Sequence, residues 1–334
     1  MASKTEKLQY LLIGMALKGL SAIPQGVRTR LAGPVGRLWY GLDRYHRRIA
    51  EDNMQRAYAG EISAGAVART VRANFVQTVR MALEIPSLLR LDRKNIDRYV
   101  TFTGEHHLRC AMARGRGILF LTGHLGNWEM MSLSVPLKFG LRINVLARPL
   151  DFRPLDRVLT EIRSRTGNRM VDKEDSAKEV QQRLNANQAV GILLDQNASF
   201  YEGVYVPFFS RLACTNRGLA VFALRYRADV IPVFNIREPD GRYRVIFEAP
   251  LTVIRTGNVR RDIVENTEVF NRVIEKFVRR APEQWFWVHR RWRIKKIPQS
   301  VRGKVMSLSS CPIADEHFYD DTPDPEKMNR AKTV

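Results

Sequence analysis

The 334-residue chain has few cysteines, and none of them stands in a spacing that binds metal. Cys110, Cys214 and Cys311 are odd in number and far apart, and no Cys-x-x-Cys pair occurs. A disulfide framework or a zinc site is therefore disfavoured, and a reducing compartment fits best. His106 and His107 stand near Cys110, but no fourth ligand follows at a usual spacing, so we predict no metal site.

Several motifs that mark common enzyme classes are also absent. The chain contains no Gly-x-Ser-x-Gly elbow, no phosphate-binding P-loop and no complete dinucleotide fingerprint. No repeat of roughly 20 to 50 residues is visible, which argues against a solenoid. We therefore expect no bound cofactor, and without a serine elbow or an activated cysteine we expect no covalent enzyme intermediate.

Acidic residues are scarce relative to basic ones. The chain has 34 Asp and Glu against 55 Lys and Arg, which gives a formal net charge of +21. The excess is spread along the chain and is not confined to a tail. Such a chain favours an anionic partner: nucleic acid, an anionic lipid surface, a phosphorylated substrate or an acidic protein. Charge alone does not choose among these.

The apolar run at the N-terminus is shorter than a membrane span. Residues 8–23 are almost wholly apolar, whereas a spanning helix needs roughly 20 such residues. The stretch Ser21-Ala22-Ile23-Pro24 is a poor signal-peptide cleavage site. Basic residues flank the run: Lys4, Lys7, Arg28 and Arg30. We therefore predict that residues 1–30 form a membrane-associating helix that lies on or dips into a cytoplasmic membrane face. The alternative is a core helix of a soluble protein.

Beyond this segment, the hydrophobic pattern predicts an α/β fold. Apolar residues recur at helical spacing from residue 36 to about residue 90. After that, short apolar runs alternate with helical stretches, which predicts a largely parallel central sheet flanked by helices. The predicted strands are 100–103, 118–122, 143–147, 190–194, 230–234 and 243–247, and the later helices are 127–139, 155–165, 176–187, 215–226 and one around 263–277. We expect one domain over residues 31–297 and a polar, disordered tail over residues 298–334.

A histidine follows directly after the first fully apolar strand. Residues 118–122 lead through Gly123 into His124, and Glu129 follows five residues later. In parallel sheets, catalytic groups gather where the carboxyl ends of strands meet loops. Glu129 could accept the ring N–H of His124, which would leave the other ring nitrogen free to act as a general base. The start of the next helix would add unpaired N–H groups for an oxyanion or a phosphate. On physical grounds alone, a capping or core histidine near an unrelated acid is an equal alternative.

This histidine stretch resembles a known acyltransferase motif. The string His-Leu-Gly-Asn-Trp-Glu at residues 124–129 resembles the His-x4-Asp/Glu motif of the lysophospholipid acyltransferase superfamily, and its ending resembles the late lauroyl/myristoyl acyltransferases of lipid A biosynthesis. Other stretches are similar to that family's blocks in order and spacing. They are residues 47–53, 147–150, 195–196 with 203–209, 230–234, and 282–292. The resemblance covers about residues 5 to 296.

The resemblance implies a glycerol-3-phosphate acyltransferase-like fold and a location at the cytoplasmic side of the inner membrane. It implies transfer of a fatty acyl chain from acyl carrier protein to a hydroxyl of a lipid A precursor, with His124 as general base and Glu129 as its catalytic partner. We predict that Asn127, Arg148, Asp195 and Gln196 contact substrate, with Arg148 at a phosphate. The alternative for Arg148 is a surface ion pair. Asp195 and Gln196 could orient the acceptor or support His124, and the alternative is that they are only polar residues at the start of a loop.

One loop leaves the acceptor open. The family commonly has glycine after the Val-Pro-Phe-Phe run and Pro-Ala-x-Thr a little later, but this chain has Ser210 to Thr215 there. A lysophospholipid or another glycolipid is therefore the alternative acceptor.

The aromatic and basic residues of 285–296 suit a membrane interface, a phosphate-bearing acceptor or stacked bases, but we expect core tryptophans with a basic rim. A non-enzymatic basic protein that binds nucleic acid or membrane is disfavoured, since it leaves the strand–His124–Glu129 arrangement unexplained.

Overall fold

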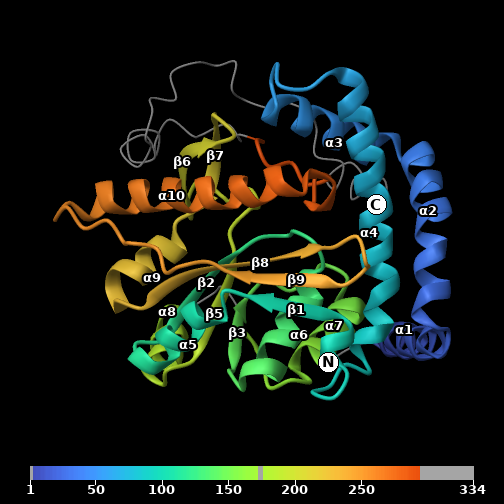
Figure 1. Ribbon diagram of the computed structural model, residues 1–334, viewed down its shortest axis with the longest axis horizontal. Helices are drawn as coiled ribbons and strands as arrows, with labels where there is room; N and C mark the ends of the chain where they lie inside the picture. Colours follow the sequence, from blue (N-terminus) through green and yellow to red (C-terminus); the bar gives the residue numbers. More distant parts are fainter. Residues whose placement is uncertain (1–2, 172–175, 294–334) are drawn as a thin grey trace.

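The computed structural model describes residues 3–171 and 176–293. It begins with four helices: α1 (Lys4–Ala22), α2 (Gln25–Leu42), α3 (Arg44–Ala57) and α4 (Ala64–Leu88). The predicted boundary at residue 30 falls inside α2, and the predicted tail, residues 298–334, lies outside the described residues. Helices α2 and α4 run side by side along one side of the sheet (Figure 1). They approach so closely at Gly36 that a Cβ there would lie 2.5 Å from the Cα of Val76.

A seven-stranded, mostly parallel sheet forms the centre of the molecule, as the sequence predicted. Its order is β1-β9-β8-β2-β5-β3-β4, and among the described pairs only β8 and β9 are antiparallel. The strands are β1 (Val100–Thr103), β2 (Ile118–Thr122), β3 (Ile143–Leu146), β4 (Arg169–Val171), β5 (Ala189–Leu193), β8 (Asp229–Arg237) and β9 (Tyr243–Phe247). Strand β2 lies between β8 and β5, with Thr122 opposite Leu193. The loop after β2 is therefore near the middle of the sheet's edge.

Helices cover both faces of the sheet, which explains the continuous apolar runs in its strands. Along β2, Leu119 and Leu121 point into one hydrophobic cluster, while Ile118 and Phe120 point into the other. The first cluster includes residues of α8 (Ser176–Asn185), α9 (Gly218–Tyr226) and α10 (Val259–Arg280), and the second includes residues of α5 (Glu105–Arg114), α6 (Trp128–Phe139) and α7 (Arg153–Ser164). Figure 1 shows α10 on one side of the sheet and α5, α6 and α7 on the other. Short 3-10 turns occur at η1 (Ile96–Arg98) and η2 (Pro282–Gln284).

A separate hairpin corrects one predicted helix. Strands β6 (Gly203–Phe208) and β7 (Arg211–Asn216) pair antiparallel, so the helix expected from Thr215 begins only at Gly218. The two-residue turn places Phe209 and Ser210 at φ of 51° and 58°. Tight hairpins of this kind usually carry Asn or Gly there, so the sequence contained no hairpin signal. The hairpin packs on α10, where the Phe209 N–H donates to Glu275 at 2.7 Å.

The predicted N-terminal helix forms and lies against α7. Tyr10 donates from its hydroxyl to the carboxylate of Glu161, with oxygen distances of 2.6 and 2.9 Å. The opposite side of α1 is exposed, and no residue of this helix is buried. Among the described helices, none is by itself long and apolar enough to cross a membrane. Helices α1 and α2 meet that criterion as a pair, with a bend of 112° between them.

Candidate active site

The loop after β2 is held in place by the chain's closing block and by two glycines. Its residues 124–126 pair with residues 284–286, since Phe286 N–H donates to the His124 carbonyl at 3.0 Å and Gly126 N–H donates to the Gln284 carbonyl at 3.0 Å. Gly126 has a φ of +62°, and a Cβ there would lie 2.4 Å from the carbonyl oxygen of Asn235. A Cβ at Gly123 would lie 3.0 Å from the Asp195 carboxylate. Both glycines therefore allow the loop to approach its neighbours closely enough to fix His124.

The carboxylate that faces His124 is Asp195, which follows β5. Nδ1 of His124 lies 2.8 Å from Oδ1 of Asp195, and the His124 backbone N–H donates to Oδ2 at 2.7 Å. Burial by itself would raise the pKa of Asp195, but His124 and the hydrogen bonds hold that pKa at about 2. An ionised carboxylate only accepts hydrogen bonds, so Nδ1 must carry a proton, and in the neutral ring Nε2 then carries the lone pair. Asp195 therefore supports His124, one of the two roles that the sequence left open for it.

A tryptophan from the closing block holds Asp195. The indole N–H of Trp285 donates to Oδ2 of Asp195 at 2.7 Å, and the side chain of Trp285 is buried. The backbone around Trp285 is bound in turn by two asparagines of the N-terminal helices. Asn74 on α4 donates to the carbonyls of Glu283 and Trp285, and Asn53 on α3 donates to those of Trp287 and His289. The early helices thus help to position the Asp195 carboxylate through Trp285.

Glu129 does not contact His124 as the sequence predicted. It lies in the first turn of α6 and faces α7, where Arg163 donates from Nε at 2.8 Å and from Nη2 at 2.5 Å. Burial alone would lower the pKa of Arg163, but the paired carboxylate raises it, so the guanidinium stays charged. The prediction of a His124–Glu129 hydrogen bond is therefore wrong, because the helix points Glu129 toward Arg163 and the ring of His124 turns toward β5. Glu129 can therefore affect the reaction only through Arg163 or through a contact with the substrate.

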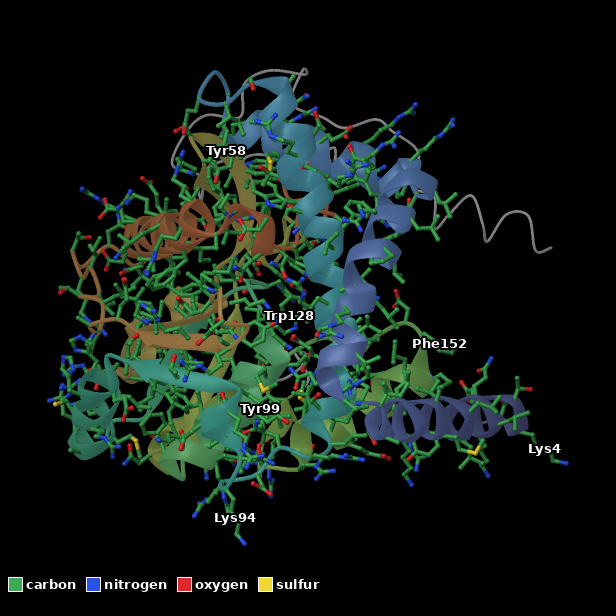
Figure 2. The ribbon with its side chains drawn as sticks, turned by 45° about the vertical axis from the view of Figure 1, so that its right-hand side comes forward. Lys4, Tyr58, Lys94, Tyr99, Trp128 and Phe152 are labelled. Atoms are coloured by element: carbon green, nitrogen blue, oxygen red, sulfur yellow. The ribbon has the colours of Figure 1, made fainter. Side chains whose placement is uncertain are left out.

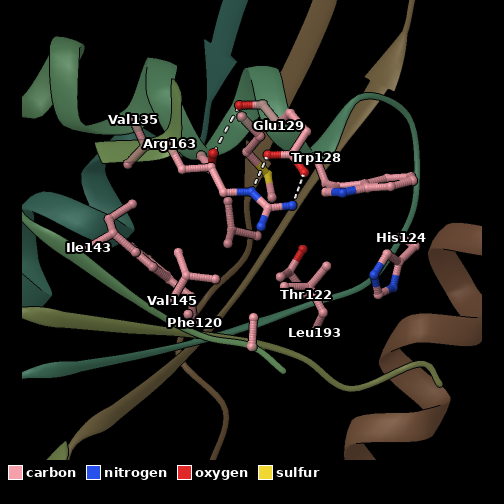
Figure 3. Close-up of a pocket in the computed structure, with 15 residues that line it drawn as sticks. Phe120, Thr122, His124, Trp128, Glu129, Val135, Ile143, Val145, Arg163 and Leu193 are labelled. Carbon is pink, nitrogen blue, oxygen red and sulfur yellow. Dashed lines mark hydrogen bonds and ion pairs between the residues drawn. The ribbon is translucent and has the colours of Figure 1, made fainter. Parts of the chain in front are cut away.

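An apolar pocket opens beside these groups. It has a volume of about 710 Å³ with its open mouth included, and it lies between the sheet and helices α6 and α7 (Figure 3). His124, Trp128, Glu129, Arg163 and Thr122 line one end. The rest of the wall is formed mostly by apolar side chains of β2, β3, β5, β8 and α6 and of the residue after β3: Phe120, Met131, Val135, Ile143, Val145, Ala147, Leu193 and Val233. The lining therefore suits an apolar group whose polar end lies beside His124.

The other residues predicted to bind substrate, Gln196, Asn127 and Arg148, lie in different surroundings. Gln196 lies at the site, with its amide nitrogen 3.5 Å from Nε2 of His124. Asn127 is fully buried and caps α6, since it accepts from Met130 N–H and donates to Glu84 at 3.0 Å. Asn127 is therefore a structural residue here, which corrects its predicted contact with substrate. Arg148 is largely exposed and pairs with Asp151 at 2.5 Å, and it is not among the residues that line the pocket, although the preceding Ala147 is.

The closing block is apolar at its centre, as predicted, but its basic residues are not all at a rim. Trp285, Trp287 and Trp292 are buried. Arg291 is fully buried as well, which corrects the predicted basic rim, and donates to the carbonyl of Cys214 at 2.9 Å and to the hydroxyl of Thr215 at 2.6 Å. Cys214 and Thr215 thus pack against the closing block, and none of residues 210–215 lines the pocket. Within residues 3–171 and 176–293, no group of His, Cys, Asp and Glu side chains is placed to hold a metal ion.

His289 in this block makes stability depend on pH. Its Nε2 accepts from the Asn197 N–H at 2.8 Å, and burial, assisted by Arg291 and His124 and opposed by Asp195, lowers its pKa to about 4. The unfolded chain binds a proton at this histidine near pH 6.5, so stability falls as pH drops from 6.5 toward 4. We expect a loss of roughly 2 kcal/mol between pH 7.5 and 5, measured by urea unfolding. His289→Gln should remove most of this slope, and an equal slope in both proteins would contradict the assignment.

Sequence comparisons agree with an enzyme that moves acyl groups. The model of the family described as "Bacterial lipid A biosynthesis acyltransferase" matches residues 2–294. The protein is therefore an acyltransferase. Specifically, it belongs to the bacterial lipid A biosynthesis acyltransferase family.

Three curated relatives with low sequence identity are also transferases of lipid A biosynthesis. The lipid A biosynthesis lauroyltransferase of Escherichia coli (strain K12) is 27% identical over 84% of this chain and 90% of its own length. The lipid A biosynthesis acyltransferase of Haemophilus influenzae is 23% identical over 83% of this chain and 85% of its own. The lipid A biosynthesis palmitoleoyltransferase of E. coli is 26% identical over 59% of this chain and 62% of its own. The names of these relatives specify different acyl chains, so similarity alone does not identify the acyl chain for this protein.

Arg163, Trp285 and Thr122 were not predicted as site residues. Arg163 reaches Glu129 across 34 positions, and Trp285 reaches Asp195 across 90. The sequence predicted that the tryptophans around Trp285 lie in the core, but it did not predict that Trp285 contacts Asp195. No local pattern marked Arg163 or Thr122.

Proposed function

We propose that this protein transfers a fatty acyl chain from acyl carrier protein to a hydroxyl of a lipid A precursor. The observation that carries the proposal is the His124–Asp195 pair at the mouth of the apolar pocket. The acyl chain would lie in the pocket, where each buried CH₂ contributes about 0.8 kcal/mol to binding. The net charge of +21 would attract the acidic carrier protein and the anionic lipid.

In this mechanism His124 acts as general base through Nε2. The acceptor hydroxyl gives its proton to Nε2 as its oxygen attacks the thioester carbonyl, and Asp195 stabilises the resulting imidazolium. Trp285 keeps the carboxylate in place. The guanidinium of Arg163, held by Glu129, supplies positive charge at the end of the pocket where negative charge develops.

The test is an assay with purified protein, acyl carrier protein loaded with chains of different length, and a panel of acceptors analysed by mass spectrometry. We expect acylation of a lipid A precursor. Transfer to lysophospholipids or another glycolipid in its place would favour the alternative acceptor, and no transfer to any acceptor would contradict the proposal. The lipid A mass profile of cells with and without the gene gives the chain length.

We also propose that helices α1 and α2 rest on the cytoplasmic face of the inner membrane. One side of α2 exposes apolar residues at helical spacing: Val27, Leu31, Val35, Leu38 and Leu42. Helix α1 exposes Leu8, Leu11, Leu12 and Met15. Exposed Phe152, which follows β3, lies on the same side of the molecule as α1 (Figure 2). Exposed Arg30 and Arg37 accompany the α2 side chains and suit anionic headgroups.

The double variant Leu31→Ser/Leu38→Ser should weaken binding to anionic vesicles. Each leucine would lose its apolar contact with the lipid, so we expect a loss on the order of 10-fold or more in a vesicle sedimentation assay. Val259→Ser is the control, because Val259 is exposed at the start of α10, away from α1 and α2. Equal binding of the double variant and wild type would refute this membrane-binding surface.

A further inference from the structure

Thr122 carries a buried hydroxyl without a partner at the active site. It is the last residue of β2, two positions before His124, and its side chain is 5% exposed. In the described part of the chain, its Oγ1 has no hydrogen-bond partner. Strand alternation turns Phe120 and Thr122 to the pocket side of the sheet, and both line the pocket. Figure 3 shows the hydroxyl pointing toward the Glu129–Arg163 ion pair.

A hydroxyl in this position needs an explanation, because burying one without a hydrogen bond is unfavourable. Valine has nearly the same shape and an equal preference for strands, so packing alone does not require threonine. The neighbouring wall of the pocket is apolar at Phe120, Val145 and Leu193. The hydroxyl therefore suits a polar group of a bound molecule that occupies this end of the pocket.

We propose that Thr122 donates a hydrogen bond to the carbonyl oxygen of the acyl thioester; this inference rests on the proposed acyl transfer. With the acyl chain in the pocket, its carbonyl group lies at the end shared by Thr122, Arg163 and His124. Oγ1 is free to donate, and the charged guanidinium of Arg163 lines the same end of the pocket. Thr122 and Arg163 together form an oxyanion site for the transferred acyl group.

The reaction step balances with these groups. The acceptor oxygen forms a bond to the carbonyl carbon, the π electron pair moves to the carbonyl oxygen, and the proton goes to Nε2 of His124. As the tetrahedral intermediate collapses, the C–S bond breaks and the thiolate of the carrier takes the proton from His124. The hydrogen bond from Thr122 strengthens as its acceptor becomes negative, so it favours the transition state over the bound thioester.

Thr122→Val and Thr122→Ser test this role together. Removing one oxyanion donor typically lowers kcat on the order of 10²-fold, so we expect such a loss for Thr122→Val, with KM for the acyl donor nearly unchanged. Thr122→Ser keeps the hydroxyl and should retain activity. Stability should follow the opposite order, because valine removes an unpaired hydroxyl whereas serine leaves a small void. Thermal unfolding should therefore show Thr122→Val at least as stable as wild type and Thr122→Ser less stable.

Thr166→Val is the matched control. Thr166 also has a buried Oγ1 without a partner, but it does not line the pocket. Its substitution should leave kcat unchanged. If wild type and Thr166→Val transfer acyl groups and Thr122→Val does so equally well, the role of Thr122 is refuted while the proposed function stands. If wild type transfers nothing from acyl carrier protein, the proposed function itself fails.

Discussion

His124→Ala should lower kcat for acyl transfer by about 10³-fold or more. Without the imidazole, no group at the pocket mouth accepts the acceptor's proton as the new C–O bond forms, and general-base catalysis contributes about 10² to 10⁴ in rate. The measurement is the initial rate of transfer from acyl carrier protein, with wild type as reference. The fold should persist, because His124 lies on a loop whose backbone is held by residues 284–286.

The control for this variant is its binding behaviour. We expect His124→Ala to bind vesicles and acyl carrier protein as wild type does, since α1, α2 and the basic surface are unchanged. Near-normal turnover of the variant would exclude His124 as the base. A variant that fails to unfold cooperatively would instead indicate that the imidazole is needed for the loop.

Asp195→Asn should also lower kcat by about 10³-fold, because it reverses the tautomer of His124. Oδ2 of Asp195 accepts two N–H groups, from His124 and Trp285, while Oδ1 accepts one, from the His124 ring. An asparagine would keep its oxygen toward the two donors and turn its NH₂ group to Nδ1. The ring would then hold its proton on Nε2 and could not act as a base there.

The ring nitrogens of His124 report this change directly. ¹⁵N chemical shifts of the imidazole should show a proton on Nδ1 in wild type and on Nε2 in Asp195→Asn. Glu129→Gln is the matched variant, since it alters the other acid near the loop and should leave the tautomer as in wild type. A tautomer change in Glu129→Gln, and none in Asp195→Asn, would restore the pairing that the sequence suggested.

The two acids Glu129 and Asp195 differ in how their positions relative to His124 are determined. The interval of five residues from His124 to Glu129 made the nearer acid the natural partner. The interval does not determine which way α6 points its side chains, and α6 points Glu129 toward Arg163 on α7. Asp195 is 71 positions from His124 and becomes its neighbour only because β5 pairs in parallel with β2.

The hairpin of β6 and β7 was missed for a related reason. Its turn residues, Phe209 and Ser210, have positive φ although neither is a residue that favours it. Contacts with α10, such as the bond from Phe209 N–H to Glu275, stabilise a turn that local preferences oppose. The turn between residues 203–208 and 211–216 therefore carried no hairpin signal.

The amino-acid sequence by itself determined the alternation of strands and helices, the position of His124 at the end of a buried strand, and the family. These follow from local periodicity and from short motifs, which are properties of neighbouring residues. Only the tertiary structure decided that Asp195 orients His124, that Trp285 holds Asp195, and that Thr122 and Arg163 share the end of one apolar pocket. The physical reason is that hydrogen bonds and pockets depend on which strands pair and which way each helix faces, and these are settled by packing across the whole chain.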